Sequence, residues 1–458
     1  MIRIRQLSGN TRKVISNVIN GVVVKGIAIL IGFLTIPAYM RYFEDNTILG
    51  VWFTILSVLS WILSFDLGMG NGLRNRIVDT IVKNEEVGTR KYISSAYIFL
   101  TAVSIVIFSI IFIVSLIIPW NKVFNISDQI IKTVDLRIAI IIVLFGIMLQ
   151  FILRLISSIL YALQESSIPN LLTLITSIIL LVFVSISNSI GNNNSIIVLS
   201  LVYLFAVNLP LLITTIIIFS KRLKNVIPSF HFFDIKYAVD TLKVGSAFLG
   251  LQLEAMVINN TSVFLITWLL GSIYVVEYNV YFKVFSLVST MYSLITVPIW
   301  SAITKAKSED DYQWIKKVTR VLQLIAILFT IGQFALLPIM QFLFDIWLKE
   351  NSIHVNYKIM ILFAIEQGII IWSGINASIC NGLNEMKWQF VLMTVGACLM
   401  FPLAIIFTNI FEGYYGVILA HSFSLLPYCI GQTVWLEWYI RKEVRNKIKI
   451  QPSGKNLY

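Results

Sequence analysis

The sequence predicts an all-α integral membrane protein with about twelve transmembrane helices, arranged as two six-helix bundles around a central cleft. Two observations predict this class: apolar segments long enough to cross a bilayer recur along the chain, and the loops between them alternate in charge. Hydrophobic residues make up 58% of the 458 residues and charged residues 13%, whereas soluble proteins have about 25% charged residues. Backbone groups in lipid need partners within their own segment, so we expect helices despite the many Ile and Val residues.

Each predicted helix is an apolar stretch near or above the roughly 20 residues that span a ~30 Å hydrocarbon core. The twelve segments lie near residues 17–37, 47–67, 92–118, 137–161, 170–190, 196–219, 244–270, 277–303, 318–344, 358–379, 389–410 and 415–437. Three further stretches, at 73–83, 235–243 and 314–318, repeat apolar residues at helical spacing beside Lys and Arg. We expect these three to be interfacial helices that anchor the chain at the membrane surface.

The distribution of basic residues predicts the orientation. Most of the 35 Lys and Arg residues lie in alternate loops: before residue 17, at 67–92, 219–244, 303–318 and 379–389, and after residue 437. The positive-inside rule then places these loops and both termini in the cytoplasm. Anionic lipid headgroups account for the net charge of +12, so no nucleic-acid partner is expected.

The chain also divides into two halves of the same orientation, because each half contains an even number of crossings. We expect an N-terminal lobe at 1–219, a cytoplasmic linker with an interfacial helix at 220–243, and a C-terminal lobe with a basic tail at 244–458. The sequences ALQE at 162–165 and GLNE at 382–385 follow equivalent segments and support such parallel repeats. A cleft between two repeats is the usual location of a transported substrate.

Three stretches carry a resemblance to a known family. LGVW at 49–52 and DLGMGNGLR at 66–74 resemble the second-helix signature of polysaccharide and O-antigen flippases, which belong to the multidrug/oligosaccharidyl-lipid/polysaccharide exporter superfamily. EYNVYFKV at 277–284 resembles the matching position of the second half, although the usual glycine is absent. With the length, the predicted spans and the orientation, the resemblance covers nearly the whole chain.

The resemblance implies a flippase in the bacterial inner membrane. Its substrate would be an undecaprenyl-diphosphate-linked oligosaccharide, moved from the inner to the outer leaflet by alternating access. It also implies contact with membrane lipids and with other polysaccharide-assembly membrane proteins.

Basic residues inside the predicted segments are the candidate substrate ligands. A diphosphate needs a wet cleft with cations, and an ionisable group at the bilayer centre costs about 2.5–3.5 kcal/mol, which favours a functional role. The candidates are Lys25, Arg154 and Lys283, with Asn259 and Asn260 as polar ligands. Each cation is roughly 9–12 Å from a segment end, so snorkelling to the interface is the alternative. The resemblance implies a cavity-facing role for Lys25 and Lys283.

Two acids lie well inside predicted segments, Glu254 and Glu366. A carboxylate at that depth can exchange a proton or hold Na⁺ during a transport cycle. The alternative is a structural role, as a partner of Lys or Arg or of a hydrogen-bond donor on a neighbouring helix.

Other chemistry has little support in the sequence. His231, His354 and His421 show no ligand spacing, so neither a metal nor another cofactor is expected beyond transported H⁺ or Na⁺. No nucleotide-binding motif is present. Two alternatives stay open: a multidrug or cation antiporter of the same superfamily, and a polysaccharide polymerase. A polymerase would need a long outer loop, which the sequence lacks, so we expect a transporter and not an enzyme.

Overall fold

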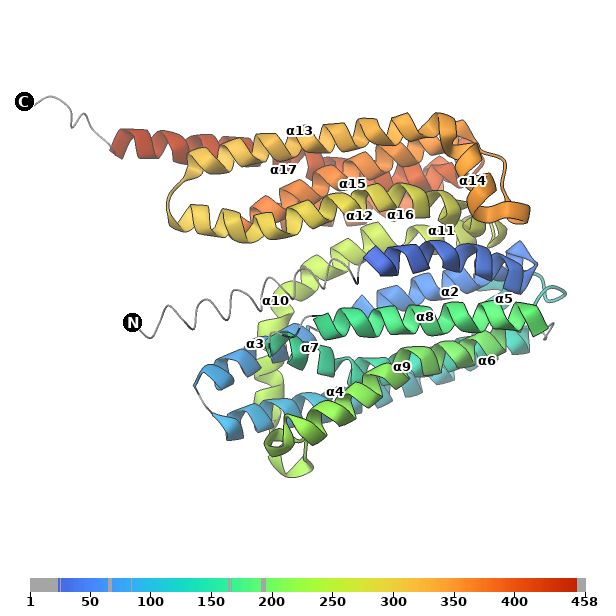
Figure 1. Ribbon diagram of the computed structural model, residues 1–458, viewed down its shortest axis with the longest axis horizontal. Coiled ribbons are helices and arrows are strands. Elements are labelled where there is room, and N and C mark those ends of the chain that lie inside the picture. The colour runs from blue at the N-terminus through green and yellow to red at the C-terminus, as the bar shows by residue number, and fades with distance from the viewer. Residues whose placement is uncertain are drawn as a thin grey trace, which may run out of the picture. The chain divides into compact units, whose positions relative to one another are not determined.

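The computed structural model describes residues 24, 26–64, 68–83, 85–163, 165, 167–190 and 195–450. Within these ranges the regular structure is helical (Figure 1), without a strand. Ten of the described helices are long and apolar enough to cross a membrane: Gly26–Phe43, Asn46–Leu63, Glu86–Ile117, Thr133–Ala162, Ser167–Ser187, Ile196–Lys221, Tyr312–Asn351, Tyr357–Leu383, Lys387–Phe411 and Tyr415–Asn446. They coincide with ten of the twelve predicted segments. The predicted all-α class is confirmed.

The other two predicted segments also fall on long helices. Segment 244–270 covers most of α10 (Ile235–Asn260) and α11 (Ser262–Leu269), and segment 277–303 lies within α12 (Ile273–Ser308). Residues 235–243 were predicted as a separate interfacial helix, but they form the first turns of the continuous α10. No proline lies between residues 235 and 260, so the backbone hydrogen bonds of the helix continue without interruption from 235–243 into the predicted segment.

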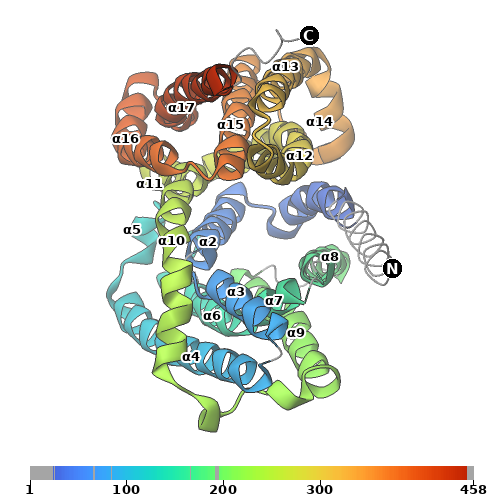
Figure 2. The same ribbon diagram turned by 90° about the vertical axis from the view of Figure 1, so that its left-hand side faces the viewer.

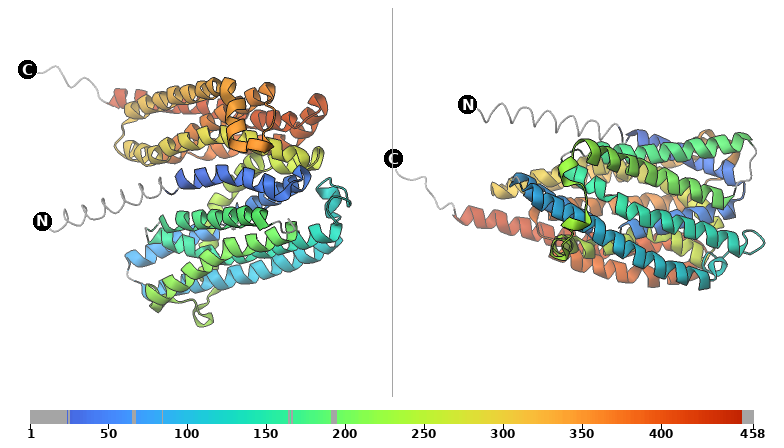
Figure 3. Two further views of the ribbon diagram at one scale, coloured as in Figure 1. Left: turned by 45° about the vertical axis from the view of Figure 1, so that its right-hand side comes forward. Right: turned by 90° about the horizontal axis from the view of Figure 1, so that it is seen from below.

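The chain forms two compact units, one up to Leu253 together with Gly271–Ile273, and the other from Glu254 to Leu270 and from Tyr274 onward. The predicted lobe boundaries at 219 and 244 stay a prediction. Within each unit the long helices run roughly side by side (Figure 3).

The first unit contains α2 (Asn46–Ser64), α3 (Met69–Val82), α4 (Glu86–Ile117), α5 (Trp120–Val123), α6 (Thr133–Leu153), α7 (Leu155–Ala162), α8 (Ser167–Ile190), α9 (Ile196–Lys221) and the start of α10. Its core joins α3, α4, α7 and α9. Leu73 and Ile77 of α3 are fully buried in this core. The stretch 73–83, predicted to lie on the membrane surface, therefore directs Leu73 and Ile77 into the protein, whereas Val78 and Ile81 are exposed.

The second unit contains α11, α12, α13 (Tyr312–Leu336), α14 (Met340–Leu348), α15 (Tyr357–Leu383), α16 (Lys387–Phe411) and α17 (Tyr415–Ile450). Apolar residues of α12, α13, α15 and α17 form its main core, among them Tyr292, Ile315, Ile375 and Leu436. In Figure 2 α17 lies between α15 and α16, and it packs against both. This arrangement places polar residues of α15 and α17 face to face.

Two glycines of the motifs at 49–52 and 66–74 lie where helices meet other backbone. A Cβ on Gly72 of α3 would be 2.0 Å from the carbonyl oxygen of Thr241 in α10. A Cβ on Gly50 of α2 would be 1.7 Å from the carbonyl oxygen of Ser272. Gly68, which precedes α3, has φ of 71°, a left-handed conformation that glycine adopts without strain. The glycines of these motifs thus allow a tight turn and two close backbone contacts.

Candidate functional site

Glu366 of α15 and His421 of α17 form a buried pair in the second unit. The distance between His421 Nδ1 and Glu366 Oε1 is 2.5 Å, and the side chains are 0% and 3% exposed. Glu366 Oε2 and His421 Nε2 are buried and have no hydrogen-bond partner. Sequence analysis identified Glu366 as a deep acid but missed its partner. The available signal was that His421 lies inside the apolar segment 415–437, where an ionisable side chain is rare.

The pair lies near one end of a row of polar contacts between α15 and α17. Further along, the Trp372 indole donates to the Thr433 hydroxyl at 2.9 Å, and the Asn376 amide donates to the same oxygen at 3.1 Å. The Gln432 amide donates to Cys380 Sγ at 2.9 Å. Membrane helices commonly associate through such hydrogen bonds, because a polar group in hydrocarbon otherwise lacks a partner. We call this row, with Glu366 and His421, the polar seam.

Glu254 occupies a second polar position in the same unit. It is 7% exposed on α10, and the Thr394 hydroxyl of α16 donates to its Oε1 at 2.5 Å. Its Oε2 is buried and has no hydrogen-bond partner. One turn along α10, Ile258 packs against Leu425 and Cys429 of α17. This apolar cluster thus lies within one turn of Glu254 on α10 and within one turn of His421 on α17.

The predicted cations are less enclosed than the acids. Lys283 is half-buried on α12, and the contacts of the described residues give its ammonium no partner. Arg154 is exposed at the junction of α6 and α7, where its guanidinium donates to the carbonyl oxygen of Leu63 at 3.1 Å. These two residues belong to different compact units. Lys25 lies outside the described residues.

The two predicted asparagine ligands lie at the end of α10. Asn259 is exposed, and its amide donates to the carbonyl oxygen of Ala255 within the same helix at 2.9 Å. Asn260 is half-buried. Asn259 lies more than one helical turn from Glu254, and all the predicted substrate ligands stay predictions.

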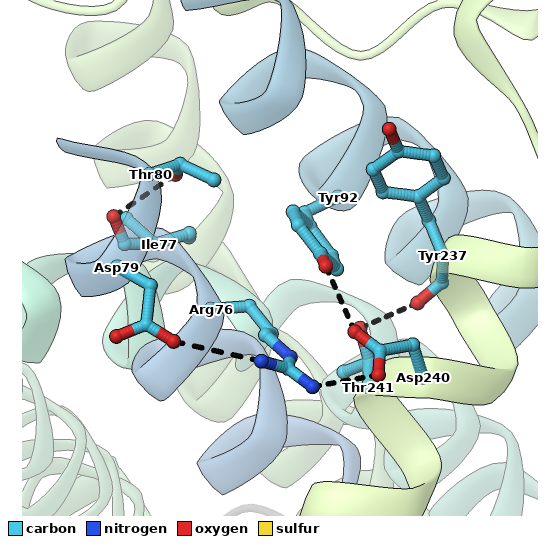
Figure 4. A network of polar contacts seen from close by, with 8 residues as sticks. All are labelled: Arg76, Ile77, Asp79, Thr80, Tyr92, Tyr237, Asp240 and Thr241. Atoms are coloured by element: carbon cyan, nitrogen blue, oxygen red, sulfur yellow. Dashed lines mark hydrogen bonds and ion pairs between the residues drawn. The ribbon is translucent and has the colours of Figure 1, made fainter. Parts of the chain in front are cut away.

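A further polar network lies in the first unit, at the crossing of α3, α4 and α10 (Figure 4). The Asp240 carboxylate accepts hydrogen bonds from the Arg76 guanidinium at 2.6 Å and from the Tyr92 hydroxyl at 2.8 Å. Arg76 also lies 3.6 Å from Asp79. Partial burial is the largest single effect and acts to lower the pKa of Arg76, but the hydrogen bond and charge of Asp240, together with Tyr92 and Asp79, outweigh it and the pKa is raised. The network holds the start of α10 on α3 and α4, and we call it the Asp240 network.

Comparison with known proteins gives the fold. The sequence matches no protein-family model and no curated protein sequence. Among solved structures, the chain is similar to an inward-facing multidrug resistance transporter of the MATE family in the MOP superfamily, at a TM-score of 0.73 and 13% identity over 93% of this chain and 99% of that one. It is also similar to the lipid II flippase MurJ in an inward closed conformation, at 0.71 and 15% over 92% and 87%.

A third similar structure is a MOP superfamily transporter from Pyrococcus furiosus, described as having a binding pocket of reverse polarity. It has a TM-score of 0.61 and 13% identity over 94% of this chain and 96% of that one. At these identities the similarity shows that the chain has the fold of MOP superfamily transporters.

Proposed function

We propose that this protein is a flippase that moves an undecaprenyl-diphosphate-linked oligosaccharide from the inner to the outer leaflet by alternating access. The shared fold supports a transporter, since the similar structures include a lipid II flippase and multidrug transporters. The proposed location is the bacterial inner membrane with both termini in the cytoplasm, beside other polysaccharide-assembly proteins. The charge distribution of the loops supports this orientation.

The observation that carries the proposal is the state of the charged side chains within the apolar helices. Glu254 and Glu366 are buried, and each already has a hydrogen-bond partner. Lys283 and Arg154 form no ion pair with a carboxylate in the described parts of the chain. The two cations are thus more accessible than the acids and have no acidic partner among the described residues, which favours a substrate with phosphate or acidic sugar groups. A carrier of cationic drugs would need the opposite balance.

The energy source that we propose is an ion gradient. The sequence has no nucleotide-binding motif, and the membrane potential supplies about 2.3 kcal/mol per charge per 100 mV. Glu254 and Glu366 are the proposed coupling residues, because each retains a buried carboxylate oxygen without a hydrogen-bond partner.

One observation favours the second candidate function, a multidrug or cation antiporter. The unpartnered Oε2 of Glu254 is a buried acceptor that could pair with an organic cation. The two functions predict opposite substrate charges, so a transport assay with both substrate types separates them.

The test uses the purified full chain in vesicles that contain a fluorescent undecaprenyl-diphosphate oligosaccharide. Flipping is measured as the growing fraction of label that a membrane-impermeant quencher reaches. We expect Lys283→Ala to lower the rate at least tenfold, because an ammonium that contacts diphosphate is lost, and Lys283→Arg to keep part of it because the charge remains. The matched control is Lys358→Ala, which removes an exposed lysine at the start of α15.

Equal rates for the parent protein and Lys283→Ala would remove this residue from the substrate path. Uptake of a cationic dye by vesicles whose labelled lipid does not move would overturn the flippase assignment in favour of the antiporter.

A further inference from the structure

The buried contact between α15 and α17 contains the two side-chain types best suited to share a proton. Glu366 and His421 meet at 2.5 Å, and neither has a lysine or arginine partner among the described residues. We propose that this pair is a proton-binding site and that the ion exchanged there is H⁺ rather than Na⁺. The role of the site in driving transport rests on the function proposed above, but proton binding itself does not.

The short distance requires a proton between the two atoms. A carboxylate oxygen and an unprotonated imidazole nitrogen are both acceptors, and two acceptors repel each other at 2.5 Å. The pair is uncharged overall when it carries two protons, either as imidazolium with carboxylate or as imidazole with carboxylic acid. Both forms place a hydrogen on His421 Nε2, which has no hydrogen-bond partner.

Release of one proton from this uncharged state needs no reactant other than water to accept the proton. The Nε2–H bond breaks, the proton leaves to water, and the Nδ1–H···Oε1 hydrogen bond remains. The pair then carries one negative charge in a site with 0% and 3% side-chain exposure. A buried, uncompensated charge is costly. Release therefore requires that water or a cation reach the pair, and rebinding of a proton restores the closed state.

The surroundings contain little that could supply a positive charge to stabilise the deprotonated pair. Tyr278 of α12 interacts electrostatically with Glu366, and it is a weak acid that carries no positive charge. Along the seam Cys380, Tyr428 and Cys429 are further titratable side chains, each about two helical turns or more from the pair along its helix, and none of them carries a positive charge. The described parts of α11, α13 and α16 form no ion pair with Glu366 or His421.

The chemistry of the pair does not suit Na⁺ or a structural metal. Hard cations prefer oxygen ligands, whereas imidazole nitrogen binds transition metals, and here the nitrogen occupies the near side of Oε1. Among the described residues, no group of three His, Cys, Asp or Glu side chains could hold a metal ion. A two-residue site with one nitrogen ligand is suited to a proton.

The test measures the proton on His421 directly. The chain has three histidines, so nitrogen-15 labelling of histidine in the full chain, in lipid nanodiscs, gives three sets of ring signals. The exposed His231 and His354 are assigned by replacing each with Gln. We expect the His421 Nε2 signal to report bound and released proton as the pH of the sample is changed. Added Na⁺ at constant pH should leave the signal unchanged.

Glu366→Gln provides the second measurement. It keeps a hydrogen-bonding group beside His421 but removes the acid, so we expect the pH dependence of the His421 signals to shift relative to the parent. Signals that stay constant over the whole pH range, or that respond to Na⁺ at constant pH, would overturn the proposal.

Vesicles then test the role in transport. His421→Asn keeps a donor near the Nδ1 position but cannot accept a proton, and we expect it to lose the acceleration of flipping by a pH gradient. If a pH gradient still accelerates flipping in His421→Asn, the pair does not couple transport to the gradient, even where the spectra show that it binds a proton. Absence of flipping in the parent protein would count against the proposed function alone, because the spectra need no substrate.

Discussion

Replacing Gly72 with alanine tests whether the glycine-rich stretch at 66–74 serves helix packing. The added Cβ would lie 2.0 Å from the Thr241 carbonyl oxygen and 2.9 Å from the carbonyl carbon. Ordinary contacts exceed 3.4 Å, so α3 and α10 would have to separate by more than an ångström. Backbone atoms cannot rotate away as a flexible side chain can. The substitution should therefore displace the start of α10.

The cost has two parts. Overpacking of a close contact costs about 1–3 kcal/mol. Separation of the helices also weakens the bond between Arg76 and Asp240, whose side chains are 29% and 36% exposed, so solvent screening reduces its contribution to about 1 kcal/mol. Alanine regains up to about 1 kcal/mol through its helix propensity. The net loss of unfolding free energy should be about 1–3 kcal/mol.

The assay is thermal unfolding of the purified protein in detergent, followed by the loss of monodisperse protein. Gly146→Ala is the matched control in the same unit, because its Cβ would meet Leu204 at 3.5 Å, an ordinary contact. We expect a lower melting temperature for Gly72→Ala and an equal or higher one for the control. Equal melting temperatures for the two variants would show that the contact with Thr241 has no energetic importance.

Two further predictions concern the same unit and the orientation of the chain. Tyr92→Phe removes one hydrogen bond to Asp240 and should lower the unfolding free energy by about 0.5–1.5 kcal/mol, measured by the same melting assay; an unchanged melting temperature would contradict a structural role for that bond. Reporter fusions after Lys243 and Arg441 should show activity on the cytoplasmic side and a fusion at Asn125 on the outer side, and one inverted reporter would refute the proposed orientation.

The fold class could be predicted from the sequence because it depends on local properties. A run of about 20 apolar residues requires a helix in lipid whatever its neighbours are, and ten described helices meet this requirement where segments were predicted. Helix ends were less accurate. The first helix runs to Phe43 rather than 37, because Tyr39, Tyr42 and Phe43 are buried and extend its apolar surface past the predicted end.

Contacts between helices could not be predicted in the same way. Arg76 and Asp240 are 164 residues apart, and Glu366 and His421 are 55 apart. Hydrophobic periodicity indicates which face of a helix is apolar, but the partner of that face depends on packing of the whole unit. For the same reason α3 was expected at the membrane surface, whereas Leu73 lies in the core.

The two deep acids were equivalent candidates in the sequence, but their partners give them different chemistry. The Oε1 atom of Glu254 accepts a hydrogen bond from a threonine hydroxyl, and its Oε2 is buried without a hydrogen-bond partner. Glu366 lies beside an imidazole, which suits a proton. Of the two positions, only the pair of Glu366 and His421 combines a carboxylate with an imidazole, so a pH gradient that still accelerates flipping in His421→Asn would transfer the coupling role to Glu254.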